Sequence, residues 1–157
     1  MRTSPPPSAF GRVERIRAGD RQVVLSFVKN PISYNATLRA IMQDAGDMPV
    51  LAVHSNTPVD GEDFSWLWDV DLEAMAPRVT TLVASGSKAE EVAMRYKYAR
   101  VPEDRIRTIP NIGTALDSAL EATCPGQTLY ILAGYTPTRE IRRIMQRRGW
   151  VSAFWKE

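Results

Sequence analysis

The fold is decided by residues 22–31, QVVLSFVKNP, in which an apolar strand runs directly into the start of a helix. Valine, leucine and phenylalanine fill most of the first seven positions, which is typical of a central strand. Asn30 is a favourable helix N-cap, and Pro31 suits the first helical position, where no amide proton is needed. Apolar residues then recur at helical spacing as far as Met42, and Gly46 ends the predicted helix.

The same strand-then-helix unit recurs along the chain, after an opening hairpin predicted over residues 11–17 and 22–28. Ser87 and Glu90 predict a capping box at one helix start, and Thr136 is predicted to cap another. This alternation predicts an α/β fold: a three-layer, Rossmann-like domain with a mainly parallel sheet, helices on both faces and an N-terminal β-hairpin. The remaining predicted strands are 49–55 (PVLAVHS), 79–85 (VTTLVAS), 105–110 (RIRTIP), 128–134 (TLYILAG) and 151–155 (VSAFW).

Length and composition limit the classes of protein that fit. A chain of 157 residues corresponds to one domain, and 44% hydrophobic with 24% charged residues is average for a folded globular domain. We expect residues 1–9, which include three prolines, to be a tether and residues 10–157 to be the domain. The net charge of +2 argues against a dedicated nucleic-acid binder. No apolar stretch reaches the roughly 18 to 20 residues of a membrane-spanning helix, so we expect a cytoplasmic protein.

The residue types present also narrow the chemistry. The single cysteine, Cys124, excludes an internal disulfide and a four-cysteine zinc site, and the single histidine, His54, cannot form a histidine metal cluster. We therefore expect no metal site. The sequence lacks the glycine-rich patterns that bind dinucleotides or triphosphates. Because ligands bind at the carboxyl ends of strands in a doubly wound sheet, we expect the site in the loops at 29–30, 55–65, 85–87 and 134–136.

The most site-like segment is residues 60–73, DGEDFSWLWDVDLE, here named the acidic tryptophan loop. Burial of Trp66 and Trp68 would hold Asp69 rigidly, as is required of a carboxylate that orients a catalytic histidine. His54 is predicted to be a satisfied histidine at a strand end, so a histidine that works with Asp69 would come from another chain. Core contacts are expected on the next helix from Met94, Tyr96 and Tyr98.

Two sets of residues resemble a known family. Residues 11–14 (GRVE), followed by Lys29, Asn30 and Pro31 at a strand end, resemble the opening of the carboxyl-terminal domain of Mur ligases. A more specific likeness, to the MurT subunits of lipid II isoglutaminyl synthases, runs from about Phe10 to Met145. The segments that carry it are 29–41 (KNPISYNATLRAI), 60–73, 84–101 (ASGSKAEEVAMRYKYARV) and 134–145 (GYTPTREIRRIM).

The resemblance implies a domain of an ATP-dependent carbon-nitrogen ligase of the glutamine amidotransferase kind. Such a ligase amidates the D-glutamate of the peptidoglycan stem peptide, on lipid II, to D-isoglutamine. It also implies a GatD-type glutaminase partner that supplies the ammonia. Asp69 would be the acid of the partner's catalytic triad, with Asp71 and Asp63 as the alternatives.

The same resemblance implies that this domain closes over ATP and Mg²⁺, which are held mainly by a central domain. Neither that central domain nor the amino-terminal domain of such ligases is expected within this sequence. Arg12, Lys29 and Asn30 would face the nucleotide across the interdomain cleft, where a positive charge steadies phosphates. Lys29 stands where a histidine is usual in Mur ligases. We expect the isolated chain to be inactive and to bind no cofactor, and the complete ligase to meet its lipid-linked substrate at the inner face of the membrane.

Two other interpretations fit the sequence. The chain can be a non-catalytic protein-interaction module that docks through the acidic tryptophan loop, in which case Asp69 tolerates asparagine as long as binding survives. It can instead be a stand-alone Rossmann-type domain that binds a small ligand, which predicts measurable affinity for ATP or AMP without further domains. The missing phosphate-binding loop argues against this last interpretation.

Overall fold

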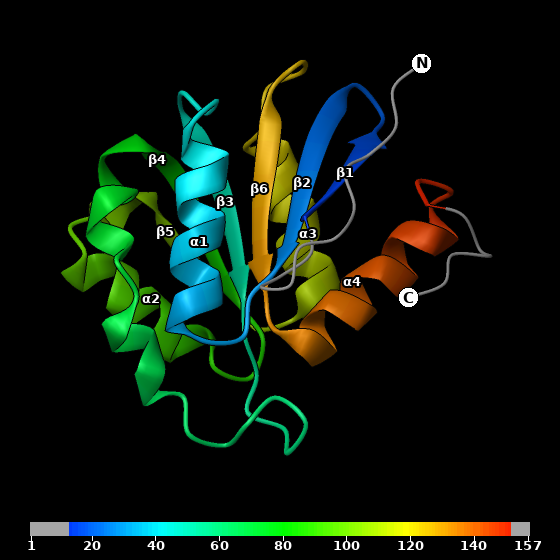
Figure 1. Ribbon diagram of the computed structural model, residues 1–157. Helices are drawn as coiled ribbons and strands as arrows, with labels where there is room; N and C mark the ends of the chain where they lie inside the picture. Colours follow the sequence, from blue (N-terminus) through cyan, green and yellow to red (C-terminus); the bar gives the residue numbers. More distant parts are fainter. Residues whose placement is uncertain (1–12, 152–157) are drawn as a thin grey trace.

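A six-stranded sheet with helices on both faces forms the centre of the structure, a computed structural model that describes residues 13–151 (Figure 1). The strands are β1 (Val13–Ala18), β2 (Arg21–Phe27), β3 (Met48–Val53), β4 (Val79–Ser85), β5 (Ile106–Thr108) and β6 (Thr128–Ala133). The α-helices are α1 (Pro31–Met42), α2 (Ala89–Tyr98), α3 (Ile112–Glu121) and α4 (Tyr135–Arg147). In the order β1-β2-β6-β3-β4-β5, β1 pairs antiparallel with β2 and the other pairs are parallel. The predicted three-layer α/β fold with an N-terminal hairpin is confirmed.

Differences from the predicted strands lie at the margins of the sheet. Residues 105–110 form a strand only over Ile106–Thr108, at the edge, and Pro110 has no amide proton with which to extend the pairing. Val151 lies in a bend and not in a strand. The rest of that predicted strand lies outside the described residues, as do the predicted tether and residues 10–12.

Two hydrophobic cores cover the two faces of the sheet because neighbouring residues on a strand point to opposite sides. β3 is buried along its whole length: Val50 and Ala52 belong to the core with α1 and α2, whereas Leu51 and Val53 belong to the core with α3 and α4. Burial on both faces explains why this strand is a continuous apolar run. Within residues 13–151, none of the helices has the length and apolar character needed to cross a membrane.

β6 lies between β2 and β3, although it follows both in the sequence. After β2 the chain enters α1 on one face of the sheet, and after β6 it enters α4 on the other face (Figure 1). Adjacent parallel strands whose helices diverge in this way leave a crevice at their carboxyl ends, and open α/β sheets bind ligands there.

The start of α1 agrees with the sequence, but the start of α2 does not. The side chain of Asn30 accepts a hydrogen bond from the Ser33 amide at 2.9 Å, and the Ser33 hydroxyl accepts one from the Asn30 amide at 3.2 Å. The predicted capping box of Ser87 and Glu90 is wrong, because the α2 N-cap has no side-chain hydrogen bond. The Ser87 hydroxyl instead donates to the side-chain oxygen of Asn56, at 3.1 Å, and so joins two loops at the carboxyl edge of the sheet.

Gly86, directly after β4, allows the backbone of two of these loops to approach closely. Its φ angle is +93°, and a Cβ atom there would lie 2.1 Å from the carbonyl oxygen of His54. That oxygen accepts a hydrogen bond from the Lys88 amide at 3.1 Å, which fixes its position.

We expect Gly86→Ala to lower the free energy of unfolding by more than about 2 kcal/mol, because it combines a positive φ with a clash against backbone. Gly46→Ala is the matched control, since a Cβ atom at Gly46 meets nothing within 4 Å. Its effect should stay within about 0.5 kcal/mol. Urea unfolding of both variants measures the difference, and equal stabilities would contradict this account.

Candidate functional site

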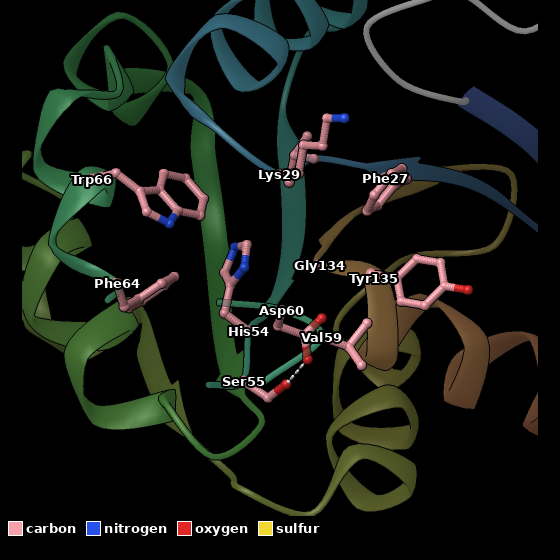
Figure 2. Close-up of a pocket in the computed structure, with 11 residues that line it drawn as sticks. Phe27, Lys29, His54, Ser55, Val59, Asp60, Phe64, Trp66, Gly134 and Tyr135 are labelled. Atoms are coloured by element: carbon pink, nitrogen blue, oxygen red, sulfur yellow. Dashed lines mark hydrogen bonds between the residues drawn. The ribbon is translucent and has the colours of Figure 1, made fainter. Parts of the chain in front are cut away.

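A pocket of about 320 Å³ opens at the carboxyl ends of β2, β3 and β6 (Figure 2). Lys29 lines it after β2, His54 and Ser55 line it after β3, and Gly134 and Tyr135 line it after β6. Three of the four loops in which the sequence places the site therefore meet here. The fourth, at Gly86, packs beneath them against the backbone of His54.

His54 is the innermost polar residue of this pocket. Its side chain is only 2% exposed and lies among the rings of Tyr34, Phe64 and Trp66, whose centroids are 5.8, 5.1 and 5.9 Å away. Nε2 lies 3.4 Å from the Tyr34 hydroxyl, which in turn lies 3.3 Å from the Tyr96 hydroxyl. Burial lowers the pKa of His54 to about 3, against a smaller opposing effect of nearby Asp60. The prediction of a satisfied strand-end histidine is confirmed.

Asp60 connects the loop after β3 to the start of α4. Its carboxylate accepts hydrogen bonds from the hydroxyls of Ser55 and Thr57, both at 2.6 Å, and from the amide of Thr136 at 2.8 Å. Burial by itself would raise the pKa of Asp60, but these hydrogen bonds together lower it below its usual value. The prediction that Thr136 caps α4 is therefore wrong. The helix begins one residue earlier, at Tyr135.

The acidic tryptophan loop forms short 3₁₀ turns, Ser65–Asp69 and Leu72–Ala74, next to the pocket. Trp66 lines the pocket, whereas Trp68 is 48% exposed and packs edge-on against Tyr98 with ring centroids 5.7 Å apart. The expectation that both tryptophans are buried is therefore wrong for Trp68. Met94 and Tyr98, expected in the core, are exposed, and only Tyr96 is buried.

The three candidate acids of this loop are all exposed but differ in their contacts. Asp63 accepts hydrogen bonds from the amide and the hydroxyl of Ser65, at 3.0 and 2.8 Å. Asp71 is held through its amide, which donates to the side-chain oxygen of Asn35 at 2.8 Å. Within residues 13–151, the carboxylates of Asp69 and Asp71 accept no hydrogen bond, so both are open to a partner.

The residues predicted to face a nucleotide have different positions. Lys29 is exposed at the rim of the pocket and extends outward (Figure 2). The side-chain oxygen of Asn30 is engaged in capping α1. Arg12 lies outside the described residues. In the described part of the chain, no three histidine, cysteine, aspartate or glutamate side chains are grouped so as to hold a metal ion.

Sequence patterns did not single out two residues of the site, Asp60 and Tyr135. Asp60 is one of several acids in one run, and nothing in the run identifies it as the acid that accepts three hydrogen bonds. Tyr135 lines the pocket and contacts Phe27 edge-on, with centroids 6.0 Å apart, because β6 lies beside β2. The one sequence feature that could have identified Tyr135 as a pocket residue is its position directly after Gly134, at the end of a strand.

The low pKa of His54 has a measurable consequence. Because the native ring stays neutral down to pH 3 whereas an unfolded histidine binds a proton near pH 6.5, the contribution of His54 to stability falls as the pH drops from 6.5 toward 3. We expect the ring proton signals in NMR spectra to stay constant from pH 8 to 5. The signals are unambiguous because the chain has one histidine. A titration midpoint near 6.5 would contradict the burial.

Comparison with known proteins identifies relatives in sequence. Residues 27–138 match the family described as MurT ligase C-terminal. The chain is 28% identical over 142 residues to the MurT subunit of lipid II isoglutaminyl synthase (glutamine-hydrolyzing) of Streptococcus pneumoniae, covering 90% of this chain and 31% of that protein. The same subunit of Staphylococcus aureus strain COL is 28% identical over 92 residues, covering 58% and 21%. The chain thus spans less than a third of the length of these relatives.

Solved structures of ligases share the fold. Folylpolyglutamate synthase of Mycobacterium tuberculosis complexed with ADP has a TM-score of 0.58 at 25% identity, covering 91% of this chain and 32% of that one. MurF of Acinetobacter baumannii has a TM-score of 0.54 at 16% identity, covering 85% and 29%, and this likeness shows the fold alone. The predicted resemblance is confirmed by the match over residues 27–138, which shows that the chain belongs to the MurT ligase C-terminal family.

Proposed function

We propose that this domain serves an ATP-dependent, glutamine-hydrolysing amide ligase that amidates the D-glutamate of lipid II to D-isoglutamine. In this proposal, Asp69 is the acid of a catalytic triad whose other members lie on a GatD-type glutaminase subunit. Family membership supports the class of enzyme, and the relatives' names describe a glutamine-hydrolysing lipid II isoglutaminyl synthase subunit.

The observation that carries the proposal is the contrast between Asp69 and His54. Asp69 is exposed on a folded 3₁₀ turn, and its carboxylate is free of hydrogen bonds within the described residues. The chain's single histidine is buried in an aromatic cluster, and its pKa of about 3 keeps it neutral. His54 is therefore unsuited to work with Asp69, and we propose that the histidine oriented by Asp69 belongs to the glutaminase subunit.

The chemistry requires little of this domain beyond a well-placed carboxylate. In a cysteine-histidine-acid site, the cysteine attacks the glutamine amide and the histidine takes up and returns the proton. Asp69 would accept a hydrogen bond from the second ring nitrogen, hold the imidazole in one tautomer and stabilise its cation.

The pocket suits a position facing the nucleotide of a neighbouring domain. The ammonium group of Lys29 at its rim can steady phosphate oxygens, with Arg12 and Asn30 as further candidates. The described residues offer no acidic cluster for Mg²⁺, so the metal would be held by the central domain. We expect the isolated chain to be inactive, since the phosphate-binding loop and the acceptor site would lie in other domains.

Two other functions remain open to test. The exposed residues Trp68 of the acidic tryptophan loop and Met94 and Tyr98 of α2 favour a docking surface. Such a surface would be sufficient for a non-catalytic interaction module. The pocket volume of about 320 Å³ is within the range of small-molecule sites, which favours measuring ATP and AMP binding to the isolated chain.

Asp69→Asn tests the proposal in the complete ligase subunit, with this sequence as its carboxyl-terminal part, bound to the glutaminase subunit. We expect glutamine hydrolysis to fall by about 10⁴-fold, as in a protease triad that loses its aspartate, because the imidazole loses its orienting acceptor. Asp63→Asn and Asp71→Asn test the two alternative acids in the same assay, and we expect Asp63→Asn to retain hydrolysis because Asp63 already bonds Ser65 within its own loop.

Size-exclusion chromatography checks that each complex remains intact. Retained hydrolysis in Asp69→Asn would refute the triad role, and if Asp71→Asn collapsed instead, the acid would be Asp71. Retained hydrolysis in all three variants with binding intact would favour the interaction module.

Lys29→Met tests the nucleotide-facing role. We expect a drop of about tenfold or more in amidation at subsaturating ATP, with glutamine hydrolysis retained, because a hydrogen bond to a charged group contributes roughly 1.5–3 kcal/mol. Lys97→Met is the control, since Lys97, on α2, pairs with Glu103 and does not line the pocket. Equal amidation by the two variants would remove Lys29 from the nucleotide site.

A further inference from the structure

Arg95, in the middle of α2, is a charged residue buried to 2% exposure beneath the acidic tryptophan loop. Its Nε donates to the carbonyl oxygen of Leu67 at 3.1 Å, and one terminal nitrogen donates to that of Val70 at 2.7 Å. Both terminal nitrogens also bind the carboxylate of Glu73, at 3.1 and 3.2 Å. The guanidinium group lies under the ring of Trp68, 5.2 Å from its centroid.

The carbonyls that Arg95 binds lie on either side of Asp69. Leu67 is two residues before Asp69, and Val70 is the residue after it. The Val70 amide also closes the turn by donating to the Leu67 carbonyl at 3.2 Å. One buried cation therefore holds both ends of the short segment from which the Asp69 side chain projects.

Burying a guanidinium is costly unless its donors find acceptors, and here two loop carbonyls and the Glu73 carboxylate accept hydrogen bonds from it. The hydrogen bonds from Arg95 to Glu73 also lower the pKa of the Glu73 carboxyl group below its usual value. A second anchor, the bond from the Asp71 amide to Asn35, fixes the chain just after the turn. Arg95 forms no hydrogen bond or ion pair with Asp69 itself, so it positions the Asp69 side chain through the backbone of the turn.

We propose that Arg95 is a positioning residue that aims Asp69 at the partner's histidine. This inference rests on the proposed function of Asp69. A lysine cannot replace Arg95, because one ammonium group at the end of a flexible chain does not match two carbonyls and a carboxylate at once. The planar guanidinium donates hydrogen bonds in fixed directions, and it therefore fixes the orientation of the turn as well as its position.

Arg95→Lys in the complete ligase, bound to its glutaminase subunit, is the test. We expect kcat for glutamine hydrolysis to fall by about 100-fold, the effect of misplacing a catalytic group by about 1 Å, with KM for glutamine little changed. Arg78→Lys is the matched control: Arg78 also binds two carbonyls, those of Met42 and Ala45, but outside the acidic tryptophan loop. It should leave kcat unchanged.

A double-mutant cycle separates positioning from a merely structural role. If Arg95 acts through Asp69, Arg95→Lys should cause no further loss of kcat in the Asp69→Asn background. Losses that multiply in the double variant, or full activity of Arg95→Lys alone, would overturn the inference. If Asp69→Asn alone leaves kcat unchanged, the proposed function of Asp69 fails. That result is distinct from a failure of the Arg95 inference, in which Asp69→Asn lowers kcat but the cycle shows no coupling.

If Arg95→Lys loses the complex, Glu73→Gln gives the same test in a milder form. It weakens the grip on the guanidinium but leaves both carbonyl bonds in place. A smaller loss of kcat that disappears in the Asp69→Asn background would support the inference. A loss that persists there would overturn it.

Discussion

The position of β6 between β2 and β3 is the constraint on which the rest of the structure depends. β6 pairs with both neighbours in parallel, and Leu129 to Ala133 are buried against both cores. Because α1 and α4 then leave on opposite faces, the carboxyl ends of the three strands enclose a crevice and not a packed layer. The pocket, the buried histidine and the loop that carries the candidate acid all lie at this edge.

Two polar anchors shape this edge. Asp60 gathers donors from its own loop and from the start of α4, and Arg95 gathers acceptors from the acidic tryptophan loop. His54 is buried among aromatic rings near Asp60, and this environment keeps it neutral. The domain thus combines hydrogen-bonded loops around a buried histidine with an exposed acid, Asp69, as the proposed role requires.

Strand positions and fold class could be predicted from the sequence because apolar runs and turn residues are local signals, as at 22–28 and 79–85. The partners of Asp60 and Arg95 could not, because they come from segments far apart in the sequence. The prediction for α2 failed for a geometric reason: Met94 and Tyr98 are four residues apart and share a face, while Tyr96 points to the other side. A helix that packs against the sheet by one face cannot bury all three. The family resemblance directed attention to Asp69, and the structure adds that His54 is not available to it.

In the proposed function, Asp69 completes a catalytic site on a second protein. The most direct measurement is a structure of the complete ligase bound to its glutaminase subunit, at a resolution that shows side chains. We expect an Asp69 carboxylate oxygen about 2.6–3.2 Å from a ring nitrogen of the partner's catalytic histidine, with the Arg95 contacts to Leu67 and Val70 retained. A catalytic histidine that bonds an acid of its own chain, with Asp69 in solvent, would contradict it.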